Sequence, residues 1–211
     1  MSNPAELYDA ILTGNAKKAE EVTKAALAAD VDASELLGKY MIPAMDEVGK
    51  RFECNEYFVP ELLIAARAMK TALQLLSPKL AAAGAKATGR VVIGTVQGDL
   101  HDIGKNLVAS MLEGGGFQVV DLGVDVPPAK FVEAAKEQAG SILAMSALLT
   151  TTMTQMKAVI KALEEAGIRG KTKVIIGGAP ITQQYADEIG ADGYGDNAST
   201  AVALARKLVA A

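Results

Sequence analysis

The chain has almost none of the residues from which proteins build disulfides and metal sites. Its 211 residues include one cysteine, Cys54, and one histidine, His101. A single thiol excludes an internal disulfide. One thiol and one imidazole are also too few ligands for a zinc or iron–sulfur centre built from protein side chains alone. These two classes of site are therefore excluded as the basis of function.

Tryptophan, long apolar runs and charge of one sign are missing as well. Aromatic residues make up 4% of a chain that is 50% hydrophobic, so Ala, Val, Leu and Met must fill the core. The net charge is −4, with acidic and basic residues interspersed, which argues against a nucleic-acid partner or a membrane surface. No run of roughly 18 apolar residues could span a bilayer, and the N-terminus lacks the regions of a signal peptide. We expect a cytoplasmic protein.

The first part of the sequence predicts four helices in an antiparallel bundle, from about residue 4 to 82. Asn3 and Pro4 provide a capping residue and a first-turn proline, and Asp32 or Ser34 is expected to start the third helix. Pro43 should bend that helix. The fourth and longest helix follows Pro60. Its apolar residues recur at steps of three and four, which is typical of bundles: Leu62, Ala66, Met69, Leu73 and Leu76.

A linker is predicted at Ala81–Gly89, where large apolar residues are absent. It separates a helical domain, residues 1–83, from a second domain, residues 90–211. There, five strands are expected at Val91–Val96, Gln118–Leu122, Ser141–Met145, Lys173–Ile176 and near Asp192–Tyr194. Helices are expected at about 104–114, 128–139, 151–166, 181–189 and 197–209. Such alternation predicts an α/β fold of flavodoxin or Rossmann type, with a five-stranded parallel sheet and helices on both faces.

The loop after the first of these strands, Gly98–Gly104, contains His101. Ligands of open α/β proteins bind at this carboxyl edge of the sheet. Asp99 lies close enough in sequence to hold one imidazole nitrogen, which leaves the other free as a base or a metal ligand. Taken alone, the stretch also fits a surface histidine or an anion-binding loop. It lacks the glycine order and the GK[ST] ending of nucleotide-binding loops.

Small residues gather in the other loops expected at the same edge. Ser146, Leu148 and Thr150 follow the third strand, and Thr150 or Thr151 is expected to cap the next helix. Gly177 and Gly178 follow the fourth strand, either as a simple turn or as room for a flat ligand. Gly193–Asn197 closes the sheet, with Asp196 or Asn197 as a cap. If the strand order is 2-1-3-4-5, these loops face one crevice.

Together, Asp99-x-His101-x-x-Gly104, Ser146-x-Leu148 and Gly177-Gly178 resemble the signature of the cobalamin-binding domain. In that family the histidine coordinates cobalt from below, and the displaced nucleotide tail enters the crevice beside the serine loop and the paired glycines. The resemblance implies that His101 is the axial ligand of a cobalamin or related corrinoid, that Asp99 orients it, and that Ser146 holds Asp99. It implies cofactor contacts from Gly98, Asp99, His101, Asp102, Ile103, Gly104, Ser146, Leu148, Thr150, Gly177, Gly178 and Tyr194.

The helical part resembles the cap of methyl-carrying corrinoid proteins. The resemblance rests on Met45-x-x-Val48-Gly49-x-x-Phe52, Phe58-Val59-Pro60-Glu61-Leu62-Leu63 and Ala65-Ala66-x-Ala68-Met69. In those proteins, apolar cap residues cover the upper face of the corrin. By position, Phe58 and Leu62 are the candidates for this role, with Met69 a weaker third. The alternative is that these side chains belong only to the bundle core.

The family implies a methyl carrier that is not itself an enzyme. Such a protein accepts a methyl group on cobalt(I) from a substrate-specific methyltransferase with a methanol, methylamine, betaine or methoxyarene donor. A second methyltransferase passes the group to tetrahydrofolate or coenzyme M, and a reductive activase is a further implied partner. Two alternatives remain: the cobalamin-binding subunit of a radical mutase, which lacks the helical cap, and a cobalamin-dependent regulator. A regulator would need a DNA-binding domain, for which residues 1–82 are not basic enough.

Overall fold

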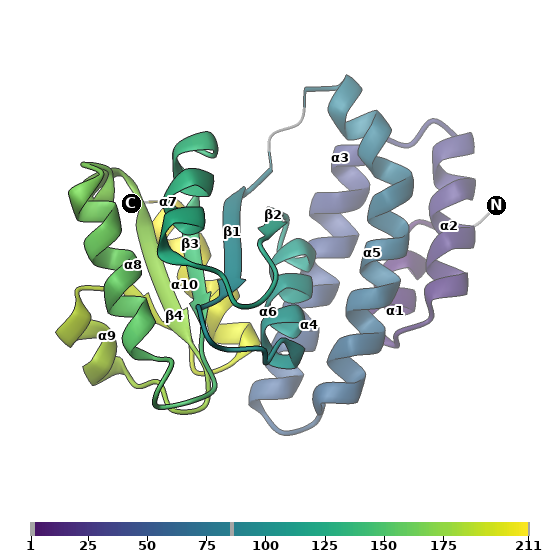
Figure 1. Cartoon of the computed structure of the whole chain (residues 1–211). Coiled ribbons are helices and arrows are strands. Elements are labelled where there is room, and N and C mark those ends of the chain that lie inside the picture. The colour runs from purple at the N-terminus through teal and green to yellow at the C-terminus, as the bar shows by residue number, and fades with distance from the viewer. Residues whose placement is uncertain (1–2, 85–86, 211) are drawn as a thin grey trace. The chain divides into compact units, whose positions relative to one another are not determined.

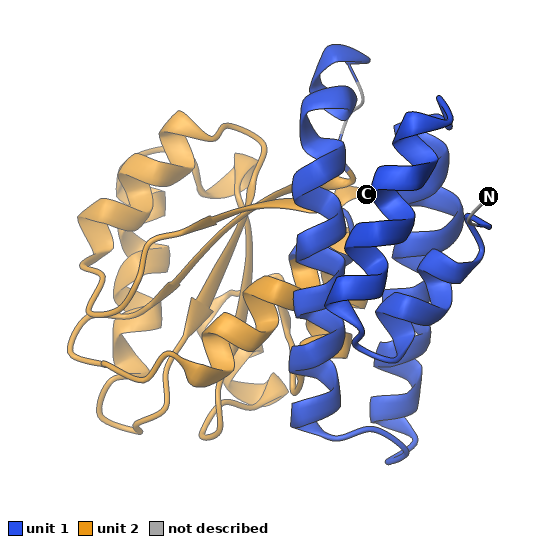
Figure 2. Ribbon diagram, turned by 90° about the vertical axis from the view of Figure 1, so that its right-hand side faces the viewer, with its two compact units in different colours: residues 1–87, 113–116 blue, residues 88–112, 117–211 orange. Residues whose placement is uncertain are grey.

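A computed structural model describes residues 3–84 and 87–210 of the chain. The chain divides into two compact units, coloured separately in Figure 2. A helical unit comprises residues 1–87 and 113–116, and an α/β unit comprises residues 88–112 and 117–211. The middle of the predicted linker, residues 85–86, lies outside the described residues. The predicted domain limits, 1–83 and 90–211, stay a prediction.

The helical unit contains the four predicted helical segments (Figure 1). They are α1 (Glu6–Leu12), α2 (Ala16–Ala28), the run α3 (Ala33–Glu35), η1 (Leu36–Met41) and α4 (Ile42–Glu53), and α5 (Val59–Ala82). Their core is made of Leu, Ala, Met and Val side chains, as the lack of aromatic residues requires. Asp32 starts the third segment by accepting a hydrogen bond from the Glu35 N–H at 2.9 Å.

Pro43 does not interrupt the third segment. A proline has no N–H and its ring conflicts with the carbonyl four residues earlier, here that of Lys39. The chain meets this constraint with a π-helical stretch at Leu36–Met41, in which the N–H of Ile42 donates to the carbonyl of Leu37. The wider turn lets the helix continue to Glu53.

The α/β unit contains the predicted five-stranded parallel sheet, and its strand order is β2-β1-β3-β4-β5, the order in which the loops named above face one another. The strands are β1 (Gly89–Thr95), β2 (Phe117–Asp121), β3 (Ile142–Ser146), β4 (Lys173–Gly177) and β5 (Gly193–Tyr194). Each predicted strand is present, with ends shifted by only a few residues. Because all five strands are parallel, their carboxyl ends lie at one edge of the sheet.

Helices cover both faces of this sheet, as predicted. They are α6 (Ile103–Gly114), α7 (Pro128–Glu137), α8 (Thr154–Glu165), α9 (Gln183–Ile189) and α10 (Ala198–Val209), with a 3-10 turn η2 (Arg169–Lys171) before β4. The helices α7, α8 and α9 pack with Val92, Leu143 and Val174 in one continuous core. Helix α10 contacts β3, β4 and β5, and the right-handed crossover rule places α6 on the face opposite α7.

Two expected helix caps have different outcomes. Asn197 caps α10 by accepting a hydrogen bond from the Thr200 N–H at 3.0 Å, as one of the two expected residues. The cap expected at Thr150 or Thr151 is wrong, because α8 begins at Thr154 after an N-cap at Met153 that makes no side-chain hydrogen bond. The intervening turn instead closes on the carbonyl of Leu149.

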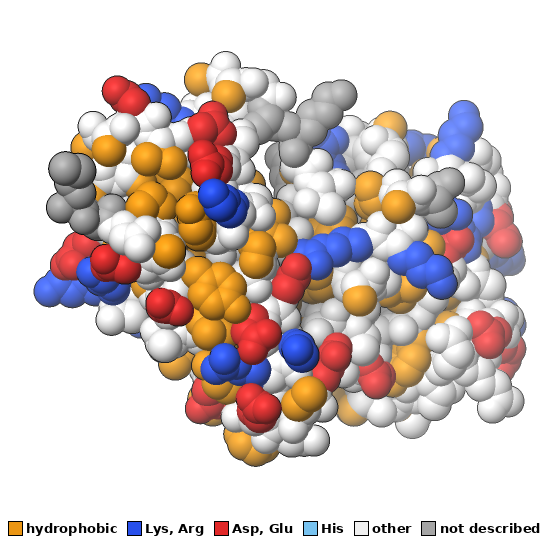
Figure 3. All heavy atoms as spheres, turned by 180° about the vertical axis from the view of Figure 1, so that it is seen from behind, with side chains coloured by type: hydrophobic (Ala, Val, Ile, Leu, Met, Phe, Trp, Pro, Cys, Tyr) orange, Lys and Arg blue, Asp and Glu red, His pale blue; other side chains and the backbone are white. Residues whose placement is uncertain are grey.

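Charge is mixed over the surface. On the face seen in Figure 3, Lys and Arg side chains lie among Asp and Glu side chains, and no large area carries one sign. None of the helices in residues 3–84 and 87–210 is long and apolar enough to cross a membrane.

Candidate cofactor site

The predicted histidine loop lies at the carboxyl edge of the sheet, between β1 and α6. The imidazole Nδ1 of His101 is 2.7 Å from Asp99 Oδ1, which confirms the expected contact between the two residues. The backbone of His101 is held on both sides: its N–H donates to Asp99 Oδ1 at 3.0 Å, and its carbonyl accepts from Thr95 Oγ1 at 2.9 Å. The side chain is nevertheless 52% exposed. The ring is thus fixed in orientation and open to a ligand.

Asp99 is fully buried and receives hydrogen bonds from a second loop, the one after β3. Its Oδ2 accepts from the Leu148 N–H at 2.8 Å and from Thr152 Oγ1 at 2.7 Å. Burial alone would raise the pKa of this carboxyl, but the hydrogen bonds from Leu148, Thr152 and His101 outweigh it and hold the pKa well below its usual range. Asp99 is therefore an ionised carboxylate that accepts a hydrogen bond from Nδ1.

The prediction that Ser146 holds Asp99 is wrong, because Thr152 makes this contact. Ser146 is the last residue of β3 and is partly buried. Among the hydrogen bonds of the described residues, none joins its side chain to Asp99. Six residues further along, the chain has turned back so that the Thr152 hydroxyl reaches the carboxylate. Three consecutive threonines at 150–152 offered no local signal for choosing between them.

This donor arrangement suits one axial position of a transition metal. When Nδ1 donates its hydrogen to the Asp99 carboxylate, Nε2 presents a lone pair, and such carboxylate–histidine pairs are typical of metal-binding imidazoles. No group of three or more His, Cys, Asp or Glu side chains among the described residues could hold a metal ion. The site therefore fits a metal that arrives with its other ligands in a macrocycle, and His101 is the residue that would bind it.

Several large apolar side chains in the His101 loop and in the loops after β2 and β3 are exposed to solvent. Ile103 is 79% and Leu100 72% exposed in the His101 loop, and Leu148 is 43% exposed in the neighbouring loop. Val124 in the loop after β2 and Leu149 are also exposed. Leaving this much apolar surface in water is unfavourable. A broad ligand with an apolar face would cover it.

The paired glycines are needed by the fold itself. A Cβ on Gly178 would lie 1.9 Å from the carbonyl oxygen of Ala147, and its φ of +131° is one that other residues rarely adopt. A Cβ on Gly177 would lie 2.9 Å from the carbonyl oxygen of Gly195. Three loops thus approach backbone to backbone here. This explains both glycines without a ligand and leaves their predicted cofactor contacts open.

The two glycines of the histidine loop differ from each other. Gly98 has a φ of +81° and its N–H donates to Asp125 Oδ1, so the turn itself requires glycine. A Cβ on Gly104, in the first turn of α6, would meet no atom within 4 Å. The fold therefore gives no packing reason for Gly104, whereas a ligand lying close to the backbone would.

The other residues predicted to contact a cofactor are less constrained. Asp102 is exposed and accepts a hydrogen bond from Asn106 Nδ2 at 3.1 Å. Thr150 is exposed in the loop after β3. Tyr194, at the end of β5, is partly buried and packs against the core under α8. Among the hydrogen bonds of the described residues, none links the side chain of any of these three residues to Asp99 or His101.

In the helical unit, Phe58 and Leu62 have opposite environments. Phe58, the N-cap residue of α5, is 60% exposed, whereas Leu62 is completely buried in line with Met69 and Leu76. The burial of Leu62 favours the alternative that it belongs to the bundle core. Exposed apolar residues at the start of α5 are instead Phe58, Val59 and Leu63.

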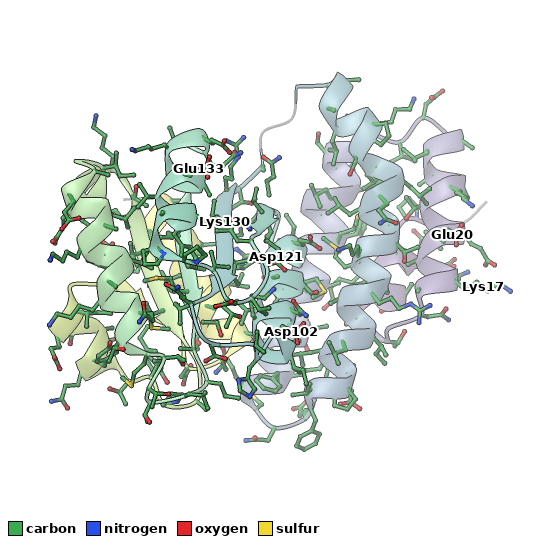
Figure 4. All side chains as sticks on the ribbon, in the orientation of Figure 1. Lys17, Glu20, Asp102, Asp121, Lys130 and Glu133 are labelled. Atoms are coloured by element: carbon green, nitrogen blue, oxygen red, sulfur yellow. The ribbon has the colours of Figure 1, made fainter. Side chains whose placement is uncertain are left out.

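Sequence reasoning missed a buried lysine beside the histidine loop. Lys105, in the first turn of α6, is almost fully buried, and its Nζ donates to Asp121 Oδ2 and, at 2.7 Å, to Asn106 Oδ1. Figure 4 labels Asp121, at the end of β2, and Asp102, at the start of α6. The ion pair ties α6 to the end of β2. A lysine after a glycine in a helix start carries no sequence signal for such burial.

The comparisons with known proteins agree with this site. Residues 89–203 match one B12 binding domain family, and residues 5–77 match a second family of the same description. The chain belongs to the B12-binding corrinoid proteins. Its cofactor is therefore a cobalamin or a related corrinoid.

Three relatives illustrate how much of the corrinoid protein is present. The chain is 47% identical to trimethylamine corrinoid protein 1 of Methanosarcina acetivorans, over 97% of this chain and 96% of the relative. A cobalamin-binding protein of Desulfitobacterium hafniense DCB-2 superimposes with a TM-score of 0.80 at 33% identity, covering 98% of each chain. A chain of the methanol:cobalamin methyltransferase complex of Methanosarcina barkeri superimposes with a TM-score of 0.83 at 31% identity, covering 97% of this chain and 78% of that one.

Proposed function

We propose that this corrinoid protein is the methyl carrier of a methyltransferase system whose donor is a methylated amine. One observation carries the proposal: His101 is oriented by a buried carboxylate and half exposed, in a chain matched from end to end by a trimethylamine corrinoid protein. A carrier needs a metal held from one side and reachable from the other. A single oriented imidazole provides the first of these.

The roles of the residues follow from their contacts. His101 Nε2 would hold the cobalt of the corrinoid, and Asp99 keeps the proton on Nδ1 and so fixes which nitrogen is available. Thr152 and the Leu148 N–H keep Asp99 ionised and in place. Leu100 and Ile103 offer apolar surface to the macrocycle. When bound, the corrinoid supplies the cobalt that accepts and releases the methyl group.

In this proposal the nucleotide tail would lie at the sheet edge beside Ser146, Gly177, Gly178 and Tyr194. The helical unit, predicted over residues 1–83, would supply the exposed Phe58 ring as apolar surface for the corrinoid.

Three partners complete the proposed cycle. A substrate methyltransferase delivers the methyl group from the amine, which agrees with the likeness to a methanol:cobalamin methyltransferase complex. A second methyltransferase passes it to tetrahydrofolate or coenzyme M. A reductive activase would be the third partner. All of these reactions are placed in the cytoplasm.

The proposal is tested with protein reconstituted anaerobically with hydroxocobalamin and reduced to cobalt(I). A co-expressed methyltransferase is supplied with trimethylamine, dimethylamine, methanol, betaine or a methoxyarene, and cobalt methylation is followed by absorption. We expect methylation with an amine donor. Methylation with methanol, betaine or a methoxyarene only would contradict the donor class, and failure to retain any corrinoid would contradict the cofactor role of the site.

The histidine is tested separately by electron paramagnetic resonance of the cobalt(II) form. Nitrogen superhyperfine splitting is expected in the unmodified protein and should disappear in His101→Ala. Corrinoid binding should largely persist in that variant, because the tail keeps its crevice. Splitting that survives the substitution would show that the ligand is the cofactor's own base.

A further inference from the structure

Asp125, in the loop after β2, makes two hydrogen bonds to the Gly98–Asp99 dipeptide. Its Oδ1 accepts a hydrogen bond from the Gly98 N–H at 2.7 Å, and its own N–H donates to the Asp99 carbonyl at 3.0 Å. The side chain and the main chain of one residue therefore bind both ends of a single dipeptide. No other part of the proposed site is held in this way among the described residues.

The backbone conformation of Asp125 suits its two hydrogen bonds to the dipeptide. Its φ is +52°, a left-handed conformation that costs most residues free energy but that Asp and Asn tolerate. The next residue, Val126, returns to the sheet, where its N–H donates to the Thr95 carbonyl at 3.0 Å. The left-handed residue thus turns the loop so that a carboxylate faces Gly98. An unfavourable conformation kept in this place needs a compensating contact, and the hydrogen bond to Gly98 is that contact.

The two hydrogen bonds of Asp125 come from a different loop than the hydrogen bonds that hold the Asp99 carboxylate. Thr152 and the Leu148 N–H reach the carboxylate from the loop after β3. Asp125 reaches the backbone of the same residue from the loop after β2, and β2 and β3 lie on opposite sides of β1 in the sheet order. The loop after β2 is itself anchored, since Asp121 accepts from Lys105 Nζ and from the Gly123 N–H at 2.9 Å.

We propose that Asp125 is a positioning residue for His101, and that its hydrogen bond to the Gly98 N–H sets how firmly the imidazole binds cobalt. The inference rests on the axial role of His101 proposed above. Asp99 carries the imidazole through its Oδ1, so a shift of the Gly98–Asp99 peptide moves the ligand directly. Asp125 acts through this peptide and does not touch the metal.

Two substitutions separate the acceptor from the backbone conformation. Asp125→Gly keeps a residue that adopts positive φ freely but removes the acceptor, and Asp125→Asn keeps both. A lost hydrogen bond of this kind weakens binding of the imidazole to cobalt(II) by about 3- to 10-fold. Cobalt(I) carries no axial imidazole, so the cobalt(II)/cobalt(I) potential should rise by about 30 to 60 mV in Asp125→Gly, at 59 mV per tenfold change for one electron. Asp125→Asn should keep the original potential.

The measurement is a redox titration of the reconstituted full-length protein, with the nitrogen splitting of cobalt(II) recorded on the same samples. An unchanged potential in Asp125→Gly, or an equal rise in Asp125→Asn, would overturn the role of Asp125 while the splitting of the unmodified protein still identified His101 as ligand. Absence of that splitting in the unmodified protein would overturn the ligand assignment and this inference together.

Amide exchange keeps the test decisive if Asp125→Gly does not fold. The Gly98 N–H of the unmodified apo-protein should exchange slowly, because it is hydrogen bonded although Gly98 is exposed. It should remain slow in Asp125→Asn. Fast exchange of this amide in the unmodified protein would show that the hydrogen bond from Gly98 to Asp125 is absent and would overturn the proposal.

Discussion

The two units fix their exposed apolar side chains by different means. In the α/β unit, Leu148 is held through its N–H by Asp99, a fully buried carboxylate 49 residues away. In the helical unit, Phe58 is held through its N–H by Glu61, three residues away at 2.9 Å, on the surface. A buried charge must keep its partners, whereas a surface hydrogen bond is readily replaced by water. Disruption of the first arrangement should cost far more stability than disruption of the second.

The loop between α4 and α5 is also held by Tyr57, which is partly exposed. Tyr57 donates from its hydroxyl to the Leu12 carbonyl at 3.2 Å, and Arg51 lies over its ring with 5.3 Å between the guanidinium carbon and the ring centroid. Arg51 is paired with Glu47 on the same helix. The anchor orients the segment before Phe58 without burying a charge. The α/β unit therefore holds its loop with a buried polar network, whereas the helical unit holds its loop with local contacts that are partly exposed to solvent.

The largest loss of stability is expected for Gly178→Ala, which disturbs the contact between loops of the α/β unit. The new Cβ would collide with the Ala147 carbonyl, and the backbone would be held at a positive φ. We expect a loss of about 2 to 6 kcal/mol, from about 1–3 kcal/mol each for overpacking and backbone strain. Urea denaturation of the apo-protein measures it. Gly104→Ala is the control and should not destabilise the apo-protein, since its Cβ meets nothing. Equal losses in both variants would contradict this view of the loops.

A second test contrasts a core residue with an exposed one in the helical unit. Leu62→Ala should lower the free energy of unfolding by about 2–5 kcal/mol, because the side chain is fully buried. Phe58→Ala should change it by less than about 0.5 kcal/mol. The order should reverse for protection of bound methylcobalamin against photolysis, where loss of the Phe58 ring has the greater effect. If Leu62→Ala were as stable as Phe58→Ala, the assignment of Leu62 to the core would be wrong.

A third test is Thr152→Val in the network around Asp99, which should cost less than Gly178→Ala or Leu62→Ala. The substitution keeps the shape of the side chain but removes a donor to a buried carboxylate, at a cost of about 1–3 kcal/mol. Thr151→Val, at the exposed neighbouring position, is the matched control and should be neutral. Thermal unfolding of the two apo-proteins compares them. A neutral Thr152→Val would show that the Leu148 N–H and His101 suffice to hold Asp99.

Much of the fold was predictable because it depends on short-range patterns. The β-branched runs at Val91–Val96 and Lys173–Ile176 predict buried strands, and their alternation with helical periodicities predicts a parallel sheet. Asp32 and Asn197 cap helices because a capping side chain acts within three residues. The contact between Asp99 and His101 was predictable for the same reason, since the two residues share one tight loop.

Short-range patterns thus determined the elements and the ligand loop, because each of these depends on residues close together in the chain. The contacts of Thr152, rather than Ser146, with Asp99, of Lys105 with Asp121 and of Asp125 with Gly98 became visible only in the folded structure. These contacts join residues 16 to 53 positions apart. They depend on how closely loops from β1, β2 and β3 approach one another, and no local periodicity or turn preference encodes that approach.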